Sequence, residues 1–529
     1  MAWMNGAQAV VKVLADQGVD RVFGLPGGAV LSLYDALRAG GIAHTLVRHE
    51  AAAAHAASGY ARATGKVGVC IATSGPGATN LLTGIATANM DSVPLVAVTG
   101  QVPSRLIGRD VFQEVDMTGA AAPFAKHVMQ ARSAAALPRM MRAALHIAAT
   151  GRPGAVVVDI PSDVAADEAN MDFAQGPELP GYRPVFEGHP LQIKRIRAAL
   201  AQSRRPLILA GGGVLSAGAW EPLQALAERL GAPVALTMMG LGAFPASHPL
   251  CLGLTGMHGA RRAMQALAQA DLVLVAGARL GDRGRVEHTL RPGTVLVHMD
   301  ADPAEIGKTL RTDIPVVGDI GAILRALLDK PAPVRPPWPF PGPEHSGHPA
   351  ARLMARLAAL LPPETIVTTD VGQHQLWAAR YLPVEQPRSF ITSGGLGTMG
   401  YGLPAAIGAA LGTGCPALVI TGDGSFQMHL PELATLAASG AKVKLLVMDN
   451  GSLGLVRELQ DEHQGGRHFG VSLDGNPDFC ALARAYGLSS RSASMEDEDA
   501  LAWLVRQPGC ALLRLMVPQG LDAQSIQEV

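Results

Sequence analysis

Two short polar segments in the last third of the chain carry residue types that bind a divalent cation and phosphate. Residues 422–425 (GDGS) follow the apolar run PALVI, and residues 449–450 (DN) follow the run VKLLVM, with 24 residues between Gly424 and Asp449. Glycine lets the backbone approach a phosphate closely. Asp423 and Asn450 offer one anionic and one neutral oxygen, which suits Mg²⁺ shared with phosphate oxygens. A Gly-rich turn and an Asx turn without a ligand would read similarly, but the paired spacing favours one magnesium and diphosphate site.

Two further segments in the first third are weaker signals by themselves. Arg48-His49-Glu50 leads into the small-residue run AAAAHAASGYAR. A carboxylate at a helix start commonly complements the helix dipole, while the alanines would let another group pack closely. Residues 73–80 (TSGPGATN) follow the run VGVCIA and read as a loop and helix start that can receive an anion or a partner.

The elements that must position these residues alternate along the chain. We expect helices over 6–17 and 50–64, and short buried strands in runs such as PLVAVTG and GAVVVDIP. Apolar strands that alternate with helices predict parallel sheets covered on both faces. Two strand ends in such a sheet open on the same edge, where ligands bind.

Two breaks divide this alternation into three blocks. A polar stretch at 165–190 reads as a linker, and residues 331–349, with eight prolines, predict an extended surface connection. The predicted fold class is therefore α/β, with three consecutive domains over 1–170, 190–330 and 350–529. Each domain is expected to have a central, mostly parallel sheet flanked by helices.

Composition excludes several classes of protein. The 529 residues allow about three domains at roughly 100–200 residues each. The chain has 43 Lys+Arg and 44 Asp+Glu, so it lacks the basic excess of a nucleic-acid binder. Five scattered cysteines without a CxxC pair exclude a disulfide scaffold and suit a cytoplasmic location. The uncharged stretch at 389–422 is long enough to span a bilayer, but frequent Gly and Pro argue against a membrane helix.

Taken together, the GDG and DN segments resemble the metal and diphosphate motif of thiamine-diphosphate-dependent 2-oxo-acid enzymes. Longer strings narrow the match: RHEAAAAHAASGYARATGKVGVCIATSGPGATN, TGQVPSRLIGRDVFQEVD, GARLGDR, TTDVGQHQLWAA and SGGLGTMGYGLPAAIGAA are similar to acetohydroxyacid (acetolactate) synthase catalytic subunits. The resemblance covers essentially the whole chain. It implies an enzyme that decarboxylates pyruvate on thiamine diphosphate and adds the two-carbon unit to a second 2-oxo acid, giving 2-acetolactate.

The resemblance implies a pyrimidine-binding domain at 1–170, an FAD-type domain at 190–330 and a diphosphate domain at 350–529. Glu50 matches the carboxylate that hydrogen-bonds the cofactor's pyrimidine. Met399 matches the apolar support that bends the cofactor, and the Gly397 backbone lies beside its amino group. The matching Mg²⁺ ligands are Asp423, Asn450 and the carbonyl of Ser452. The residues that match the diphosphate lining are Val371, Gly372, Gln373, His374, Gly424, Ser425, Leu453 and Gly454.

Further matches concern the second substrate and a flavin. Arg283 matches the arginine that receives the second acid's carboxylate, although a surface ion pair with Asp282 is its plainer reading. Phe112 and Gln113 match residues near the reacting carbon, and Lys126 matches a residue at the pocket entrance. FAD is structural in the family, and a domain that has lost its flavin is the alternative. The positions that match its binding are Arg152, Gly211, Gly212, Thr237, Met257, His258, Gly277, Arg279, Asp300, Ile306 and Asp319.

Several positions depart from the family. Gly281 stands where an Asp is usual, and Asp449 stands where the superfamily usually has Asn. After Asn450 the chain reads GSLGLVRELQDEHQ where the family reads close to LGMVRQWQ, so Leu455 replaces a Met and Leu459 a Trp. In the family that Trp favours 2-oxobutanoate over pyruvate. Because one pocket methylene is worth about 1–3 kcal/mol of discrimination, we expect little preference for 2-oxobutanoate.

Two other readings stay open. One is a specialised carboligase or a 2-oxo-acid decarboxylase with a different acceptor. The other is a non-catalytic homologue, which the presence of Glu50, Asp423 and Asn450 disfavours. The resemblance implies 2-oxo acids as partners and an active site shared between two chains, hence a homodimer or a dimer of dimers. It leaves open a separate regulatory subunit and feedback by branched-chain amino acids.

Overall fold

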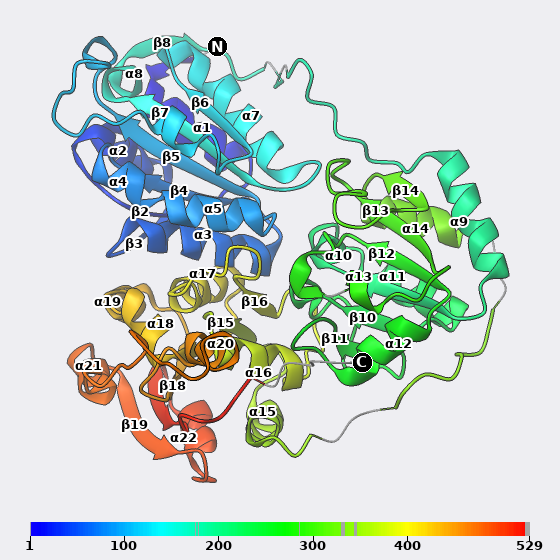
Figure 1. The fold of residues 1–529 in the computed structure, drawn as a ribbon. Coiled ribbons are helices and arrows are strands. Elements are labelled where there is room, and N and C mark those ends of the chain that lie inside the picture. The colour runs from blue at the N-terminus through cyan, green and yellow to red at the C-terminus, as the bar shows by residue number, and fades with distance from the viewer. Residues whose placement is uncertain are drawn as a thin grey trace.

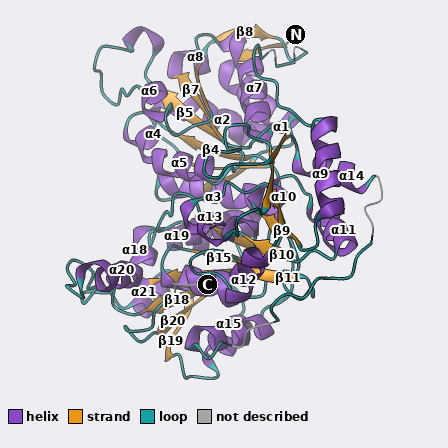
Figure 2. Cartoon of the chain, turned by 45° about the vertical axis from the view of Figure 1, so that its right-hand side comes forward, coloured by secondary structure: helices purple, strands orange, loops and turns teal. Residues whose placement is uncertain are grey.

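Three sheets organise the molecule. The structure is a computed structural model that describes residues 2–523, except 175, 178, 285, 330–333 and 343–345. Within those residues it has three six-stranded sheets with parallel strands, each covered by helices (Figure 1 and Figure 2). The predicted fold class, three consecutive α/β domains, is confirmed.

The first sheet has the strand order β3-β2-β4-β5-β7-β6. Every residue of β4, β5 and β7 is buried, as expected for parallel strands with helices on both faces. Its strands are β2 (Arg21–Leu25), β3 (Ala43–Leu46), β4 (Gly68–Ala72), β5 (Leu95–Gln101), β6 (His127–Gln130) and β7 (Ala155–Pro161). Its helices are α1 (Gly6–Asp16), α2 (Leu31–Gly40), α3 (Glu50–Thr64), α4 (Pro76–Asn80), α5 (Leu82–Met90), α6 (Met117–Ala121), α7 (Leu137–Ala149) and α8 (Ser162–Ala166).

The linker expected at 165–190 begins later than predicted. Its first residues complete α8 and then form β8 (Glu168–Met171), which pairs antiparallel with β1 (Ala2–Asn5). Only Met171 of this two-stranded ribbon is buried, so the ribbon lacks the buried, exposed alternation that marks a strand in a sequence. Strands β1 and β8 also lie at opposite ends of the domain's sequence, so no local sequence pattern indicates that they pair.

The central sheet has the order β11-β10-β9-β12-β13-β14. Numbered within the domain this is 3-2-1-4-5-6, the arrangement of dinucleotide-binding folds, in which ligands bind where the order reverses. Its strands are β9 (Pro206–Ala210), β10 (Val234–Leu236), β11 (Cys251–Leu254), β12 (Leu272–Ala276), β13 (Val295–Asp300) and β14 (Ile314–Val317). Its helices are α9 (Pro190–Gln202), α10 (Gly212–Ser216), α11 (Trp220–Leu230), α12 (Arg261–Gln269), α13 (Val286–Thr289) and α14 (Ile320–Leu328).

The third sheet, β16-β15-β17-β18-β20-β19, repeats the arrangement of the first, 2-1-3-4-6-5 within each domain. Its strands are β15 (Ile366–Thr369), β16 (Phe390–Thr392), β17 (Ala417–Gly422), β18 (Val443–Asp449), β19 (Ser489–Ser494) and β20 (Ala511–Met516). Its helices are α15 (Pro349–Leu360), α16 (Gln373–Tyr381), α17 (Gly402–Thr413), α18 (Asp423–Met428), α19 (Glu432–Ser439), α20 (Gly454–Gln464), α21 (Phe479–Ala485) and α22 (Ala500–Arg506). Among the described residues, no helix combines the length and apolarity needed to cross a membrane.

The proline-rich linker is only partly described, since 331–333 and 343–345 lie outside the described residues. The part at 334–342 has neither helix nor strand, as predicted. This segment does not lie wholly on the surface, however, because Trp338 is buried and its Nε1 donates to the Pro206 carbonyl at 2.8 Å. This anchor ties the linker to the central domain.

Small residues bring the first and third domains of the chain together. Helix α3 lies against α17 (Figure 1). A Cβ at Gly408 would overlap the Ala56 carbonyl oxygen, and one at Gly59 would overlap the Ala405 carbonyl oxygen. The alanine-rich run therefore serves close helix packing within the chain, in addition to placing Glu50 at the start of α3.

A cluster of buried histidines lies at the same interface. The His55 ring packs edge-on against His429 and Tyr401, with centroids 5.5 and 5.3 Å away. Neither nitrogen of His55 has a hydrogen-bond partner among the described residues. Burial lowers the pKa of His55 to about 3, and the neighbouring His429 and His49 act in the same direction. The ring is therefore neutral in the folded protein at neutral pH.

This burial predicts acid sensitivity. The unfolded chain binds a proton at His55 below about pH 6.5, whereas the folded chain excludes it down to about pH 3, so stability falls with pH across that window. Between about pH 7.5 and about pH 5 the free energy of unfolding falls, and we expect His55→Met to remove about 2 kcal/mol of that fall. Calorimetric unfolding midpoints of wild type and variant at both pH values check this. An equal drop in both proteins would contradict it.

Candidate active site

One pocket of about 120 Å³ lies at the carboxyl ends of the strands of the third sheet. The GDG and DN segments follow neighbouring strands, β17 and β18, as the spacing predicted. The structure brings these predicted cofactor and metal residues into its lining: Val371, Gly372, Gln373, His374, Met399, Asp423, Gly424, Ser425, Asn450, Ser452, Leu453 and Gly454. Gly397 lies just outside the lining, with a positive φ of 72° and its Cβ direction toward Val371.

Glycines let the pocket wall close on itself. A Cβ at Gly424 would come within 2.8 Å of the Leu453 side chain, and one at Gly422 within 2.9 Å of His374 Nδ1. At Gly454 a Cβ would overlap Gln373 Oε1. Only backbone fits at these points, which is the property that a close phosphate contact requires.

Two polar atoms in the pocket wall bear on what the pocket binds. Ser452 Oγ and His374 Nε2 are buried and lack a hydrogen-bond partner among the described residues. Buried polar atoms are nearly always satisfied in folded proteins, so two such atoms in one cavity wall indicate a ligand. The donor set at Asp423, Asn450 and Ser452 is one carboxylate with neutral oxygens, which fits Mg²⁺ shared with a diphosphate. No cluster of three or more His, Cys, Asp or Glu suited to a metal occurs in the described part of the chain.

The surroundings of Asp423 disfavour the charged form of its carboxyl group. The pKa of Asp423 is raised to about 6, chiefly by burial; a hydrogen bond from Asn476 opposes this rise and the nearby Asp449 carboxylate adds to it. Asn476 Nδ2 donates to Asp423 at 2.7 Å and to Asp449 at 3.3 Å. Arg514 Nε donates to Asp449 at 2.7 Å, so the departure at 449 is balanced by an arginine on β20. A divalent ion beside Asp423 would offset the burial of its charge.

Two supporting residues escaped the sequence reasoning. Asp370, fully buried after β15, accepts from Gly402 N at 2.7 Å and from the Thr421 hydroxyl at 2.6 Å. It thereby fixes the turn between Met399 and α17. Trp377 lines the pocket one helical turn after Gln373. That i, i+4 spacing was a signal available in the sequence, whereas the contacts of Asp370 are not local.

Glu50 stands at a different edge from this pocket. It begins α3 after β3, is 7% exposed, and accepts from Asn80 Nδ2 at 2.9 Å. The backbone before it is held by Glu432 on α19, which accepts from the amides of Arg48 and His49 at 2.9 and 3.0 Å. The pocket lining comes from residues 371–517, so a single chain does not bring Glu50 into it.

The loop that carries Phe112 and Gln113 lies near Glu50. A Cβ at Gly75 would meet Gln113 at 2.9 Å, and one at Gly77 would lie 3.4 Å from Glu50 Oε1. Gln113 has a positive φ of 60°, and the Phe112 side chain is 88% exposed.

Lys126 and Arg283 make local contacts within the chain. The Lys126 ammonium donates to the carbonyls of Ile147 and Thr150 at 2.5 and 2.6 Å. Burial lowers the pKa of Lys126 to about 8. Arg283 is exposed and pairs with Asp282 at 3.5 Å, which is the plainer of the two readings of this residue. Their roles at a substrate pocket stay predictions.

The residues matched to a flavin gather at one edge of the central sheet. Each of its strands is followed by at least one of them: Gly211 and Gly212 after β9, Thr237 after β10, Met257 and His258 after β11, Gly277 and Arg279 after β12, Asp300 at the end of β13, then Ile306, and Asp319 after β14. At the switch point the glycine loops pack on each other, since a Cβ at Gly211 would overlap the Gly277 carbonyl. Asp319 also caps α14, accepting from Ala322 N at 2.9 Å.

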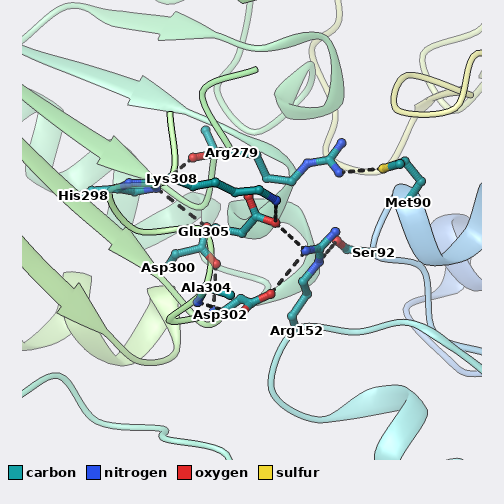
Figure 3. A network of polar contacts seen from close by, with 11 residues as sticks. Met90, Ser92, Arg152, Arg279, His298, Asp300, Asp302, Ala304, Glu305 and Lys308 are labelled. Carbon is teal, nitrogen blue, oxygen red and sulfur yellow. Dashed lines mark hydrogen bonds and ion pairs between the residues drawn. The ribbon is translucent and has the colours of Figure 1, made fainter. Parts of the chain in front are cut away.

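A polar network joins this edge to the first domain (Figure 3). Arg152 donates to Asp302 at 3.2 Å and to Glu305 at 2.8 Å, and its Nε donates to Ser92. Burial raises the pKa of Asp300, beside this network, to about 6. The pairs are only a quarter exposed or less, so screening by solvent is limited. The network fixes the central domain against the first.

The departures on α20 border the pocket. Leu455 lines it together with Val456, whereas Leu459, one turn further, is 40% exposed and lies outside the lining. Residues 521–523 of the C-terminal tail reach the pocket wall, where Trp377 Nε1 donates to the Asp522 carbonyl at 2.8 Å.

Comparisons with known proteins match this architecture. The thiamine pyrophosphate enzyme families match in three parts: the N-terminal TPP binding domain at 4–120, the central domain at 193–327 and the C-terminal TPP binding domain at 370–515. A probable acetolactate synthase large subunit of Methanocaldococcus jannaschii is 45% identical over 523 residues, 94% of this chain and 88% of that protein. The acetolactate synthase isozyme 3 large subunit of Escherichia coli K12 is 43% identical, over 92% of this chain and 89% of its own length. The chain therefore belongs to the thiamine pyrophosphate-dependent enzymes, in the family of acetolactate synthase large subunits.

Proposed function

We propose that this enzyme decarboxylates pyruvate and adds the two-carbon unit to a second 2-oxo acid, giving 2-acetolactate. The observation that supports this most directly is the pocket at the third sheet. It joins a GDG carboxylate, the DN amide, close-approach glycines and unpartnered buried polar atoms in one wall. When bound there, thiamine diphosphate supplies the carbanion chemistry that no side chain can supply.

In this proposal the chain's own residues bind and orient the cofactor, the metal and the substrates. Asp423, Asn450 and the Ser452 carbonyl would hold Mg²⁺, and the glycines would admit the diphosphate. Met399, in the pocket wall, would support the cofactor by apolar contact. Glu50 would accept a hydrogen bond from the pyrimidine ring of a cofactor held by the partner chain. Arg283, Phe112, Gln113 and Lys126 then border the second substrate in the assembled dimer.

A flavin fits the central domain. The strand order and the glycines at its switch point are typical of dinucleotide sites, and Asp300 at the end of β13 is a carboxylate that suits a ribose hydroxyl. We propose FAD there as a structural group, held by the residues at the carboxyl edge of the sheet. An absorbance scan of the purified protein near 450 nm, followed by release of the flavin on denaturation, tests this.

The proposed assembly is a homodimer or a dimer of dimers. Glu50 and the metal pocket lie at separate edges of one chain, and the exposed Phe112 stands beside Glu50. A second copy that brings its Glu50 edge to this pocket completes both sites by symmetry. Because the relatives are named large subunits, we also propose that a separate small subunit binds.

Product analysis with pyruvate alone tests the proposed reaction. We expect 2-acetolactate and one CO₂ for each pair of pyruvates, dependent on thiamine diphosphate and Mg²⁺. Free acetaldehyde as the main product would instead favour a 2-oxo-acid decarboxylase. Absence of turnover with intact cofactor binding would favour a non-catalytic homologue.

Leu455 and Leu459 on α20, which depart from the family sequence, predict which 2-oxo acid the enzyme prefers as acceptor. With pyruvate and 2-oxobutanoate in competition, we expect the wild type to give the two acetohydroxy acids in nearly the ratio of the supplied acids. Leu459→Trp should shift the ratio toward 2-aceto-2-hydroxybutanoate by about tenfold. Leu459 itself lies outside the pocket lining, but the Trp that the family has at this position favours 2-oxobutanoate, and its larger ring extends further toward the pocket than Leu. Chromatography of the products measures the ratio. A strong 2-oxobutanoate preference in the wild type would contradict the prediction.

A further inference from the structure

Glu458 is connected through one side chain, Gln373, to the predicted metal ligand Asn450. It is on α20, at a position where the family string LGMVRQWQ has Gln. Glu458 Oε1 accepts from Gln373 Nε2 and, at 2.7 Å, from the backbone amide of Ala523 in the C-terminal tail. It therefore joins the tail to the pocket wall.

The other end of the Gln373 amide faces the metal site. Asn450 Nδ2 donates to Gln373 Oε1 at 2.9 Å. Gln373 Nε2 also donates to the Leu521 carbonyl at 2.8 Å. A carboxylate and a carbonyl only accept hydrogen bonds, so Gln373 must turn its NH₂ toward them and its oxygen toward Asn450.

The same rule of donors and acceptors fixes the orientation of the Asn450 amide. Because Gln373 presents an acceptor, Asn450 must turn its NH₂ toward Gln373 and its Oδ1 away. That oxygen accepts from Ser452 N at 3.0 Å, on the side of the pocket where Ser452 lies. An amide flipped the other way would offer Mg²⁺ a nitrogen with hydrogens, which does not bind a cation.

We propose that Glu458 is a positioning residue: together with the docked tail, it fixes the amide of Gln373, and through it the orientation of the metal ligand Asn450. The inference rests on the proposed function, because it assigns Asn450 to the Mg²⁺ site. It predicts that cation affinity depends on a helix and a tail that do not touch the cation.

The test is a Mg²⁺ titration of the full-length protein with thiamine diphosphate, followed by tryptophan fluorescence, to which Trp377 in the pocket wall contributes. Glu458→Gln preserves size but adds a donor, so the amide of Gln373 loses its single orientation. We expect the half-saturating Mg²⁺ concentration to rise about tenfold, with kcat at saturating Mg²⁺ nearly unchanged. A chain ending at Gly520, which lacks the Leu521 and Ala523 contacts, should show a shift in the same direction.

Glu462→Gln is the matched control, since Glu462 is more than half exposed on the same helix and loses the same charge. Its half-saturation should equal that of the wild type. Equal half-saturation in Glu458→Gln, Glu462→Gln and wild type would overturn the inference alone. No cofactor-dependent fluorescence change in the wild type would overturn the proposed function and the inference with it.

Discussion

Glu50→Gln is expected to reduce turnover by about 10²- to 10⁴-fold while cofactor binding stays measurable. Glu50 is buried and holds one oxygen on Asn80, so its other oxygen is left for a ligand at the sheet edge. An amide keeps the size and the hydrogen bond count but cannot favour the protonated pyrimidine as a carboxylate does.

Steady-state kinetics at saturating Mg²⁺ and thiamine diphosphate measure this loss, and fluorescence titration measures binding separately. Glu187→Gln, an exposed residue far along the chain, serves as the control and should keep wild-type turnover. Full activity in Glu50→Gln would refute the assigned role. If Glu50→Gln unfolds the protein, the calorimetric unfolding midpoint will show it. Glu50→Asp, which keeps the charge but shortens the side chain, would then test whether the position of the carboxylate matters.

Asp423→Ala is expected to weaken Mg²⁺-dependent cofactor binding by more than about 100-fold, since even residues that merely support metal ligands cost 10- to 100-fold in affinity. Asp423 is the one carboxylate in the described ligand set, and the pocket offers only neutral oxygens besides it. The variant also relieves the cost of burying its charge, so the apo fold should not be destabilised by electrostatics. Fluorescence titration gives the affinity, and Asp474→Asn, an exposed aspartate two residues before Asn476, is the control.

Mixing the two inactive variants tests where the site is built. If Glu50 and Asp423 of different chains form one site, a mixed dimer of Glu50→Gln and Asp423→Ala holds one wild-type site. Random pairing by a two-fold symmetric interface should then restore about a quarter of wild-type activity. No recovery, in a mixture shown to exchange subunits, would place the site within one chain.

The local chemistry of the site was readable in the sequence. GDG, DN and the segment 371–374 with Gly372 follow strand runs, and parallel strands open on one edge, so their meeting in one pocket follows from short-range pattern alone. The three α/β blocks were readable for the same reason, since strand and helix periods are local. Helix 50–64 was predicted with its observed bounds because its apolar run ends at a glycine cap.

Only the tertiary structure decided which residues support that chemistry. The pairing of β1 with β8, the hold of Glu432 on the backbone before Glu50, and the contacts of Asp370 each join segments far apart in sequence. Their side chains have no local pattern, because a buried carboxylate is defined by donors that other elements bring to it. The same reason hid Glu458: a substitution in a polar helix became a link between tail and metal ligand only when Gln373 and Ala523 lay beside it.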